Sequence, residues 1–274
     1  MTTTITLPRQ DEATSLEHHP RPAFAMVRQT LALSRRTLIK LRRTPEQFFD
    51  VTLQPIIFLV MFVYLFGGAV SGSQSVYLQF VLPGLLLQNV LFATVAIGVN
   101  LNGDVQKGVF DRFRSLPISR SAPLVGAVVA EVVRYAATTA VTLVTGFAMG
   151  FRVHTSALSA VAAIALLLGF ALCACWISVF VGMVVRTQGA VQGITFMIMF
   201  PLTFAASTFV PANTLPGWLQ AWVRVNPVNH AIEAMRGLLV GGPVAGPLTW
   251  TIGWGLGLLV VFAPLAVRAY RRRS

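Results

Sequence analysis

The sequence predicts an all-α integral membrane protein with six transmembrane helices. Of its 274 residues, 55% are hydrophobic and 11% are charged, and the mean hydropathy is +0.71. A soluble globular chain carries about 25% charged residues, so this chain lacks the polar side chains needed to cover itself in water. Its length leaves room for about six apolar helices of ~20 residues with their connections.

Six apolar segments are long enough to cross a hydrocarbon core of about 30 Å, at about 1.5 Å per helical residue. The second and fourth exceed this length and are expected to tilt or kink, and Pro83 lies near the start of the second. The predicted spans are Val51–Val70, Tyr77–Leu101, Arg134–Phe151, Leu158–Val185, Val191–Val210 and Leu248–Val267.

Two segments precede the first span. Residues 1–22 are polar and contain no apolar run of the signal-peptide kind, which predicts a disordered cytoplasmic tail. Residues 23–49 are predicted to form an amphipathic helix in the lipid headgroup region, and the six-span domain is expected over residues 50–274. Basic side chains surround the apolar positions of this helix, which are Phe24, Val27, Leu31, Leu38 and Leu41.

The distribution of Arg and Lys predicts that both termini are cytoplasmic. One side of the membrane receives the N-terminal basic cluster, the segment Asp104–Arg120, Arg186 and the C-terminal arginines. The other side receives Arg152, Arg224 and Arg236. Because basic residues concentrate on the cytoplasmic side of membrane proteins, the net charge of +12 reflects topology rather than nucleic-acid binding.

The longest segment on the outer side, Pro211–Pro247, predicts two short helices that dip partway into the membrane. Asn226 followed by Pro227 has the form of an N-cap with proline at the first helical position. The helix Val228–Val240 would shelter an ion pair between Glu233 and Arg236, and glycines follow it.

Other polar groups in the apolar segments have structural explanations. Cys173 and Cys175 face different sides of a helix and are expected to be inert core residues. Glu131 and Arg134 are three residues apart and are expected to form an ion pair. An integral membrane enzyme acting on lipid would need a cluster of acids or histidines at one depth. The candidates for such a cluster are scattered over both faces of the membrane: His154, His230, Glu131 and Glu233.

The sequence contains no ATP-binding P-loop. Such a loop requires Gly-Lys-Ser/Thr, and the two lysines, Lys40 and Lys107, follow Ile39 and Gln106. If ATP drives this protein, another polypeptide must bind it.

Two motifs resemble the membrane permease subunit of type-2 ABC transporters, in particular the daunorubicin/doxorubicin-resistance type of exporter. Between Asp104 and Pro117 the family pattern matches at Gly108, Asp111, Arg112 and Pro117, while Val109 replaces the usual Thr. The second motif is Asn226–Arg236, which is similar to Asn-Pro-Leu-x-Tyr-x-x-Glu-x-x-Arg, with His230 at the Tyr position. The resemblance covers nearly all of the chain beyond the N-terminal tail.

This resemblance implies a homodimer of six-span subunits, paired with two copies of a separate ATPase subunit that binds ATP and Mg. It makes residues 23–43 a connecting helix and Asp104–Arg120 the coupling helix, in which two phenylalanines on one face can enter a groove of the ATPase. The expected coupling residues are Asp104, Lys107, Gly108, Phe110, Asp111, Arg112, Phe113 and Pro117. The expected outer re-entrant motif comprises Asn226, Pro227, His230, Glu233 and Arg236.

The same resemblance implies a substrate path between the two protomers, formed by the first, second and fifth spans. Polar groups at membrane depth line this path or bond neighbouring helices, and the sequence leaves both roles open. They are Gln54, Gln88, Asn89, Gln192, Thr195 and Thr203. Gln88 and Asn89 point about 100° apart on a helix, so one of the two is expected to face the path.

The leading functional prediction is a permease in a bacterial plasma membrane that exports a hydrophobic or amphipathic small molecule, such as an antibiotic, drug, polyketide or lipid-like product. Charged residues are scarce in the spans, which suits an apolar cargo. The alternative is export of lipid-linked glycan or teichoic acid. Exporters of that kind often show aromatic rows along the channel, whereas the tryptophans here fall mostly in the outer segment and the sixth span.

Overall fold

The computed structural model describes residues 45–107 and 122–273 of the chain. Within these two ranges the regular structure is helical, with nine α-helices and one short 3-10 helix. The predicted tail and residues 23–44 of the predicted interfacial segment lie outside the described residues. Residues 45–49, assigned above to that segment, belong instead to the first described helix.

Among the described residues, seven helices run along the molecule and three shorter elements lie between the last two of them. The helices that run along the molecule are α2 (Pro45–Ser71), α3 (Gln74–Ala93), α4 (Val95–Gln106), α6 (Ala122–Ala148), α7 (Ala157–Val184), α8 (Gln188–Phe204) and α11 (Ala245–Arg273). Between α8 and α11 lie η2 (Ala212–Thr214), α9 (Gly217–Val225) and α10 (Pro227–Leu239).

Five helical stretches are long and apolar enough to cross a membrane. They are Val51–Ser71, Gln74–Gln106, Gly126–Ala148, Ala157–Val184 and Ala245–Arg272, which coincide with the first four predicted spans and the sixth. The predicted start of the third span at Arg134 is too late, since α6 begins at Ala122. The charges of Glu131 and Arg134 do not end that helix because they form an ion pair (N–O distance 3.4 Å).

The fifth predicted span, Val191–Val210, is shorter in the structure. Its helix, α8, has 17 residues and ends at Phe204, so it is about 25 Å long. Residues 205–210 continue as turns and bends rather than as helix.

Helices α3 and α4 form one nearly continuous rod of 33 residues. The interruption is at Thr94, whose backbone stays close to helical (φ −67°, ψ −18°), and not at Pro83, which lies within α3. The Thr94 hydroxyl donates a hydrogen bond to the Leu91 carbonyl oxygen (2.6 Å). A side chain that bonds the preceding turn in this way locally perturbs a helix.

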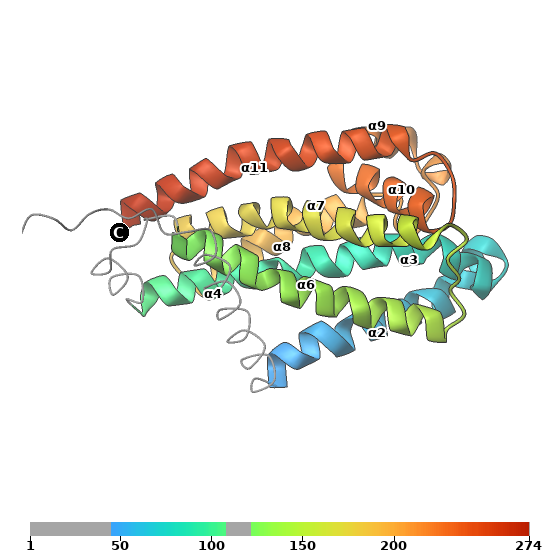
Figure 1. The fold of residues 1–274 in the computed structure, drawn as a ribbon, viewed down its shortest axis with the longest axis horizontal. Helices are drawn as coiled ribbons and strands as arrows, with labels where there is room; N and C mark the ends of the chain where they lie inside the picture. Colours follow the sequence, from blue (N-terminus) through green and yellow to red (C-terminus); the bar gives the residue numbers. More distant parts are fainter. Residues whose placement is uncertain (1–44, 108–121, 274) are drawn as a thin grey trace, which may run out of the picture.

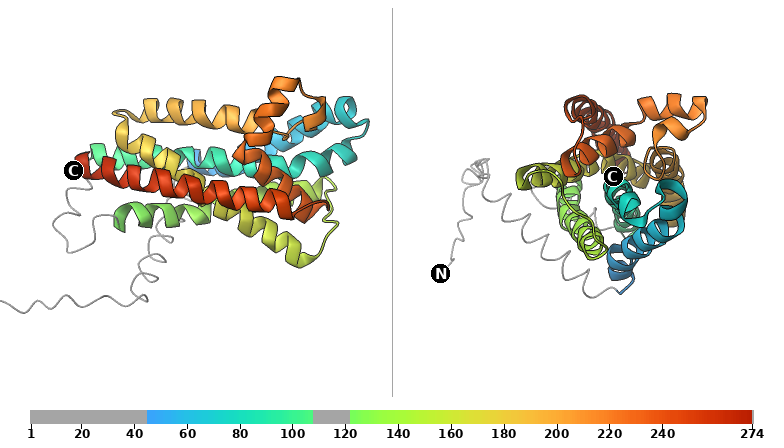
Figure 2. Two further views of the ribbon diagram at one scale, coloured as in Figure 1. Left: turned by 90° about the horizontal axis from the view of Figure 1, so that it is seen from above. Right: turned by 90° about the vertical axis from the view of Figure 1, so that its right-hand side faces the viewer.

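The long helices pack side by side along one axis (Figure 1). In that view α4 ends, α6 begins, α7 turns into α8, and α11 ends at the left, while α9 and α10 lie at the right. The two further views show the helices as a bundle with α9 and α10 at one end (Figure 2). The buried core is centred on α3 and α7, with Tyr77, Leu82, Leu85 and Leu167 fully enclosed.

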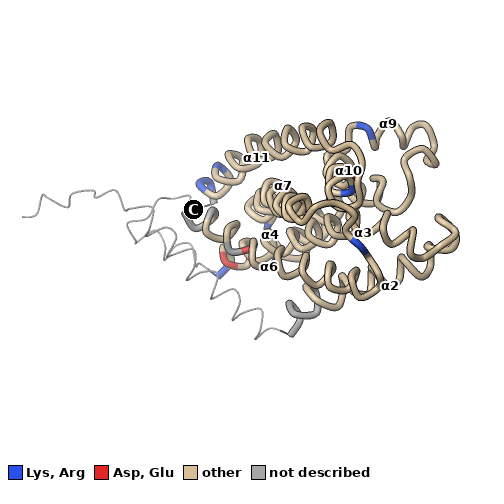
Figure 3. The backbone as a smooth tube through the Cα atoms, turned by 45° about the vertical axis from the view of Figure 1, so that its right-hand side comes forward, with Lys and Arg blue, Asp and Glu red and all other residues tan. Residues whose placement is uncertain are grey.

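Apart from the pair Glu131 and Arg134 within α6, the charged residues of the described chain lie toward the two ends of the bundle (Figure 3). The end at which α4 and α11 finish holds the larger group of basic residues: Lys107, Arg186, Arg268, Arg271 and Arg272. The opposite end holds Arg152, Arg224 and Arg236.

Candidate functional site

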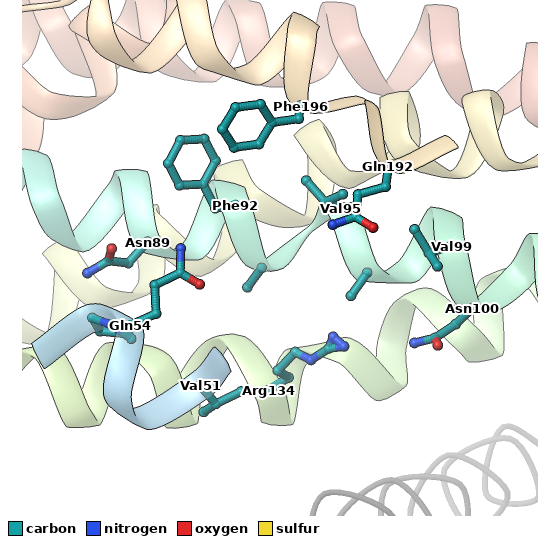
Figure 4. A pocket seen from close by; sticks show the side chains of 13 residues that line it. Val51, Gln54, Asn89, Phe92, Val95, Val99, Asn100, Arg134, Gln192 and Phe196 are labelled. Carbon is teal, nitrogen blue, oxygen red and sulfur yellow. The ribbon is translucent and has the colours of Figure 1, made fainter. Parts of the chain in front are cut away.

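A cleft with a volume of about 460 Å³ lies among α2, α3, α4, α6 and α8. Figure 4 shows α8 on one side of it, α2 and α6 on the other, and the α3–α4 rod between them. The cleft is therefore formed by elements far apart in the sequence.

The cleft has an amide-rich lining. Gln54 enters from α2, Asn89 and Asn100 from α3 and α4, and Gln192 from α8 (Figure 4). The Asn89 side-chain amide donates a hydrogen bond to the Thr142 hydroxyl of α6 (3.4 Å). These groups can donate and accept hydrogen bonds beside the apolar side chains that share the lining, which suits a ligand with both polar and apolar parts.

Arg134 adds a cation to this lining from the side of α6 (Figure 4). The side chain is 7% exposed and lies beside the Glu131 carboxylate. Because the carboxylate compensates the guanidinium charge, the pair adds polarity to the cleft without a strong net charge.

The other predicted pathway residues do not line the cleft. Gln88 is fully buried, and neither its amide nitrogen nor its amide oxygen has a hydrogen-bond partner among the described residues. Thr195 is likewise buried. The Thr203 hydroxyl donates to the Met199 carbonyl oxygen of its own helix (2.9 Å), which fits the alternative of a locally satisfied group. Of the adjacent pair Gln88 and Asn89, it is Asn89 that lines the cleft.

A row of phenylalanine rings in contact, which was not among the predicted features, begins in the cleft. Phe92 and Phe196 both line it, with ring centroids 5.4 Å apart. From Phe196 the row continues along α8 through Phe200 (5.7 Å) to Phe204 (4.2 Å).

Beyond α8 the row crosses to α2. The Phe204 ring lies 5.2 Å from Phe209, and the Phe209 ring stacks on Phe62 at 4.2 Å. Phe62 in turn contacts Phe58 (5.8 Å) and Phe66 (5.5 Å). The pattern that would have indicated this row is the four-residue spacing of phenylalanine in both segments, which places rings on one helical face. We call this set the phenylalanine row: Phe58, Phe62, Phe66, Phe92, Phe196, Phe200, Phe204 and Phe209.

Two short helices, α9 and α10, are present in the segment that was predicted to form a pair on the outer side. The Asn226 side chain caps α10 by accepting a hydrogen bond from the Val228 amide (2.9 Å), and Pro227 follows it, as predicted. The same Asn226 amide donates to the carbonyl oxygens of Leu202 (2.8 Å) and Ala205 (3.1 Å) at the end of α8. Asn226 therefore caps two helices at once.

The next turn of α10 bonds the non-helical segment that follows α8. The Asn229 side-chain oxygen accepts a hydrogen bond from the Ser207 amide (3.0 Å), and its nitrogen donates to the Glu233 carboxylate (2.9 Å). Non-helical backbone at membrane depth is tolerated where the protein itself supplies hydrogen-bond partners.

The predicted ion pair between Glu233 and Arg236 does not form. Arg236 instead donates to the carbonyl oxygens of Ser207 (2.9 Å) and Phe80 (3.3 Å), and its guanidinium lies 4.0 Å from the centre of the Phe80 ring. Burial lowers the pKa of Arg236, which lies outside the candidate spans, to about 10, and the nearby Glu233 offsets part of that shift. The guanidinium therefore stays protonated at neutral pH.

His230, the residue at the Tyr position of the motif, lies against α11. Its ring stacks on Trp250 with centroids 5.6 Å apart, and its Nε2 lies 2.9 Å from the Arg224 carbonyl oxygen. His230 thus connects α9 and α11 to the start of α10.

Only the edge of the predicted coupling segment lies within the described residues. Asp104 is half-buried on the last turn of α4, and Lys107 is exposed just beyond it. The remaining predicted coupling residues lie outside the described residues: Gly108, Phe110, Asp111, Arg112, Phe113 and Pro117.

Neither of the two cysteines is in a disulfide. Over residues 45–107 and 122–273, no three or more His, Cys, Asp or Glu side chains come together as a metal-binding group.

Comparisons with a protein family and with individual proteins both match this chain to ABC transporters. Residues 28–240 match the ABC-2 type transporter family. The chain is 41% identical over 266 residues to a daunorubicin resistance ABC transporter permease protein of Streptomyces coeruleorubidus, covering 95% of this chain and 93% of that protein. It is 29% identical over 236 residues to a doxorubicin resistance ABC transporter permease protein of Mycobacterium tuberculosis, covering 80% of this chain and 81% of that protein.

Proposed function

This chain belongs to the ABC-2 type transporter family, and on that premise we propose that it is the permease subunit of an ATP-driven exporter of hydrophobic or amphipathic small molecules. The cargo would be an antibiotic, drug, polyketide or lipid-like product. ATP hydrolysis belongs to a separate subunit, because the sequence has no P-loop. The named relatives, which are drug-resistance permeases matched over most of their length, support this assignment.

The observation that carries the proposal is the composition of the cleft. Its amide groups offer hydrogen bonds, while Phe92 and Phe196 offer a stacking surface within the same volume of about 460 Å³. Such a combination suits an amphipathic molecule with apolar rings and a few polar substituents. The phenylalanine row extends this apolar surface from the cleft to Phe66 on α2.

The working unit is a homodimer of six-span subunits with two ATPase subunits and cytoplasmic termini. Helix α8 would supply the sixth crossing, with α9 and α10 as the re-entrant pair on the outer side. Large apolar side chains of α2 and α8 are exposed in the single chain, including Ile57, Met61 and Met197. A second copy facing this side would close a path along the cleft and the phenylalanine row.

The ATPase would bind at the opposite end of the bundle, through the segment that starts at Asp104. Asp104 and Lys107 lie at that end, together with the larger group of basic residues described above. The motion caused by ATP binding would reach the cleft through α4.

Ring removal in the cleft tests the cargo assignment. The full-length chain is purified with the ATPase that accompanies it and reconstituted in liposomes, and ATP hydrolysis is measured against daunorubicin concentration. Since a stacking contact contributes about 1 kcal/mol, Phe196→Ala and Phe92→Ala should each raise the half-stimulating concentration about fivefold.

The matched control is Phe147→Ala, which removes an exposed ring of α6 that does not line the cleft and should leave the concentration unchanged. Equal responses in all three variants would contradict a binding role for the cleft.

The phenylalanine row also favours a second candidate, export of lipid-linked glycan or teichoic acid, for which aromatic rows along the path are expected. The same liposomes distinguish the two. Stimulation by a lipid-linked oligosaccharide without stimulation by daunorubicin would replace the first assignment with the second.

A further inference from the structure

The last turn of α4 is tied to the turn between α7 and α8. The Asn102 side chain is fully buried, and its nitrogen donates to the carbonyl oxygens of Gly182 (2.9 Å) and Val185 (2.6 Å). Carbonyl oxygens at the end of a helix lack partners within that helix, so Asn102 satisfies the C-terminus of α7 from a different helix.

Gln106, one turn further along α4, extends this connection. Its side-chain nitrogen donates both to the Asn102 side-chain oxygen (2.8 Å) and to the Arg186 carbonyl oxygen (2.8 Å). The two residues thus bond three backbone carbonyl groups at the end of α7 and in the turn that follows it, those of Gly182, Val185 and Arg186. We call Asn102 and Gln106 the α4 clamp.

The backbones of α4 and α7 touch beside the α4 clamp. A Cβ atom at Gly98 would clash with the Ser178 carbonyl oxygen, and one at Gly182 would clash with the Gly98 carbonyl oxygen. One turn earlier, the Thr94 and Ser178 hydroxyls are 3.4 Å apart. Packing this close leaves the two helices little room to slide independently.

Helix α8 follows the clamped turn at once. Three residues, Val185 to Thr187, separate α7 from α8, and Thr187 caps α8 by accepting a hydrogen bond from the Ala190 amide (3.3 Å). A Cβ atom at Gly103 of α4 would clash with the side chain of Gln188, the first residue of α8. Gln192 and Phe196, which line the cleft, lie one and two turns further along α8.

We infer that the α4 clamp is the mechanical link through which movement at the cytoplasmic end of α4 reaches α8 and opens or closes the cleft. Asn102 and Gln106 are positioning residues in this role, since neither lines the cleft. Gln106 lies within the segment Asp104–Arg120, but it is not one of the residues predicted to contact the ATPase. The inference rests on the proposed function, because it assigns a route to the motion that ATP hydrolysis supplies.

The test measures transport and hydrolysis in the same liposomes. ATP is added to the complex of the full-length chain with its ATPase. The ratio of daunorubicin molecules transported to ATP molecules hydrolysed is then determined. Gln106→Ala should lower this ratio at least about fivefold, the factor that corresponds to the loss of one of its two hydrogen bonds. Asn102→Asp, which keeps the acceptor for Gln106 but loses both donors, should lower it at least as much.

Gln79→Ala is the matched control. Gln79 is also a glutamine that bonds the backbone of a neighbouring segment, by donating to the Gly150 carbonyl oxygen (3.4 Å) and accepting from the Arg152 amide (3.5 Å), but at the opposite end of the bundle. The ratio of daunorubicin transported to ATP hydrolysed should be the same in Gln79→Ala as in the wild type.

Hydrogen exchange in the first turn of α8 provides a second readout, which a purely structural role would not affect. Addition of ATP with vanadate should change this exchange in the wild type and in Gln79→Ala, but not in Gln106→Ala. Gln106 is exposed, so this variant decides the test even if Asn102→Asp fails to fold.

If Gln106→Ala has the wild-type ratio of transport to hydrolysis and the wild-type change in hydrogen exchange, the proposed role of the α4 clamp is wrong. The proposed exporter function would not be affected by that result. A wild-type complex that moves neither daunorubicin nor lipid-linked oligosaccharide would overturn both.

Discussion

At the scale of single residues, Arg236 makes other contacts than its place in the sequence motif suggests. Its position suggests an ion pair with Glu233, three residues before it. In the structure the guanidinium instead satisfies two carbonyl oxygens, of Ser207 and Phe80, and covers the Phe80 ring. Glu233 accepts its hydrogen bond from Asn229, so the two charges stabilise different parts of the same region.

This arrangement predicts unequal effects of mutation. Arg236→Met should lower the free energy of unfolding by about 3 kcal/mol, because it removes two charge-assisted hydrogen bonds and leaves two carbonyl oxygens without a donor. Glu233→Gln should cost less than about 1 kcal/mol, since Gln still offers an oxygen to Asn229. Denaturation in mixed micelles measures both. Equal losses would indicate that the ion pair holds α10 after all.

At the scale of elements, α8 ends where a side chain from α10 can replace its missing hydrogen bonds. The Asn226 side-chain amide donates hydrogen bonds to the carbonyl oxygens of Leu202 and Ala205. The Ser207 amide donates to the Asn229 side-chain oxygen, and the Ser207 carbonyl oxygen accepts from Arg236. The chain can therefore leave the helix and turn toward α9 within the protein. Four hydrogen bonds thus join α10 to the end of α8 and to the segment that follows it.

The double role of Asn226 gives a sharp prediction. Asp caps helices as well as Asn does, so Asn226→Asp would be neutral if capping α10 were its whole function. We expect instead a loss of about 2 kcal/mol, because Asp cannot donate to Leu202 and Ala205. Thermal unfolding in detergent measures the change.

Ser156→Ala serves as the comparison, since Ser156 caps α7 by accepting from the Ser159 amide (3.1 Å) and otherwise bonds the Ser159 hydroxyl of the same turn (2.9 Å). It should cost about 1 kcal/mol. An Asn226→Asp protein with wild-type stability would contradict the proposed link between α8 and α10.

At the scale of the whole molecule, the arrangement of helices and charges gives the bundle two different ends. The end that holds Arg186 and the C-terminal arginines is the more basic, as expected for a cytoplasmic face. Five helical stretches have the length of a span, and α8 runs beside them with about 25 Å of helix. Whether the chain crosses five or six times therefore depends on α8.

The accessibility of introduced cysteines measures the number of membrane crossings. In a background with Cys173→Ala and Cys175→Ala, single cysteines are introduced in place of Arg186 before α8 and Trp218 after it, and intact cells are treated with a membrane-impermeant thiol reagent. Six crossings with cytoplasmic termini predict labelling at position 218 in intact cells, and at position 186 after permeabilisation. Arg152→Cys and Arg272→Cys mark the outer and inner faces. Labelling of 186 and 218 under the same condition would exclude a crossing by α8.

Features that depend on composition, or on residues close together in the chain, could be predicted from the sequence. Scarcity of charge predicted membrane helices, Asn226-Pro227 predicted the start of α10, and the spacing of Glu131 and Arg134 predicted their ion pair. Each of these follows from interactions within a few residues, or from the transfer of a segment between water and lipid.

The tertiary structure alone decided which distant groups meet. The cleft takes its amides from α2, α3, α4 and α8, the phenylalanine row crosses from α8 to α2, and Asn102 bonds carbonyl oxygens about 80 positions away in the chain. The rotation of each helix about its axis is set by packing against all of its neighbours at once. A local pattern does not contain that information, so Asn102 and Asn89 look alike in the sequence, although one holds two helices together and the other lines the cleft.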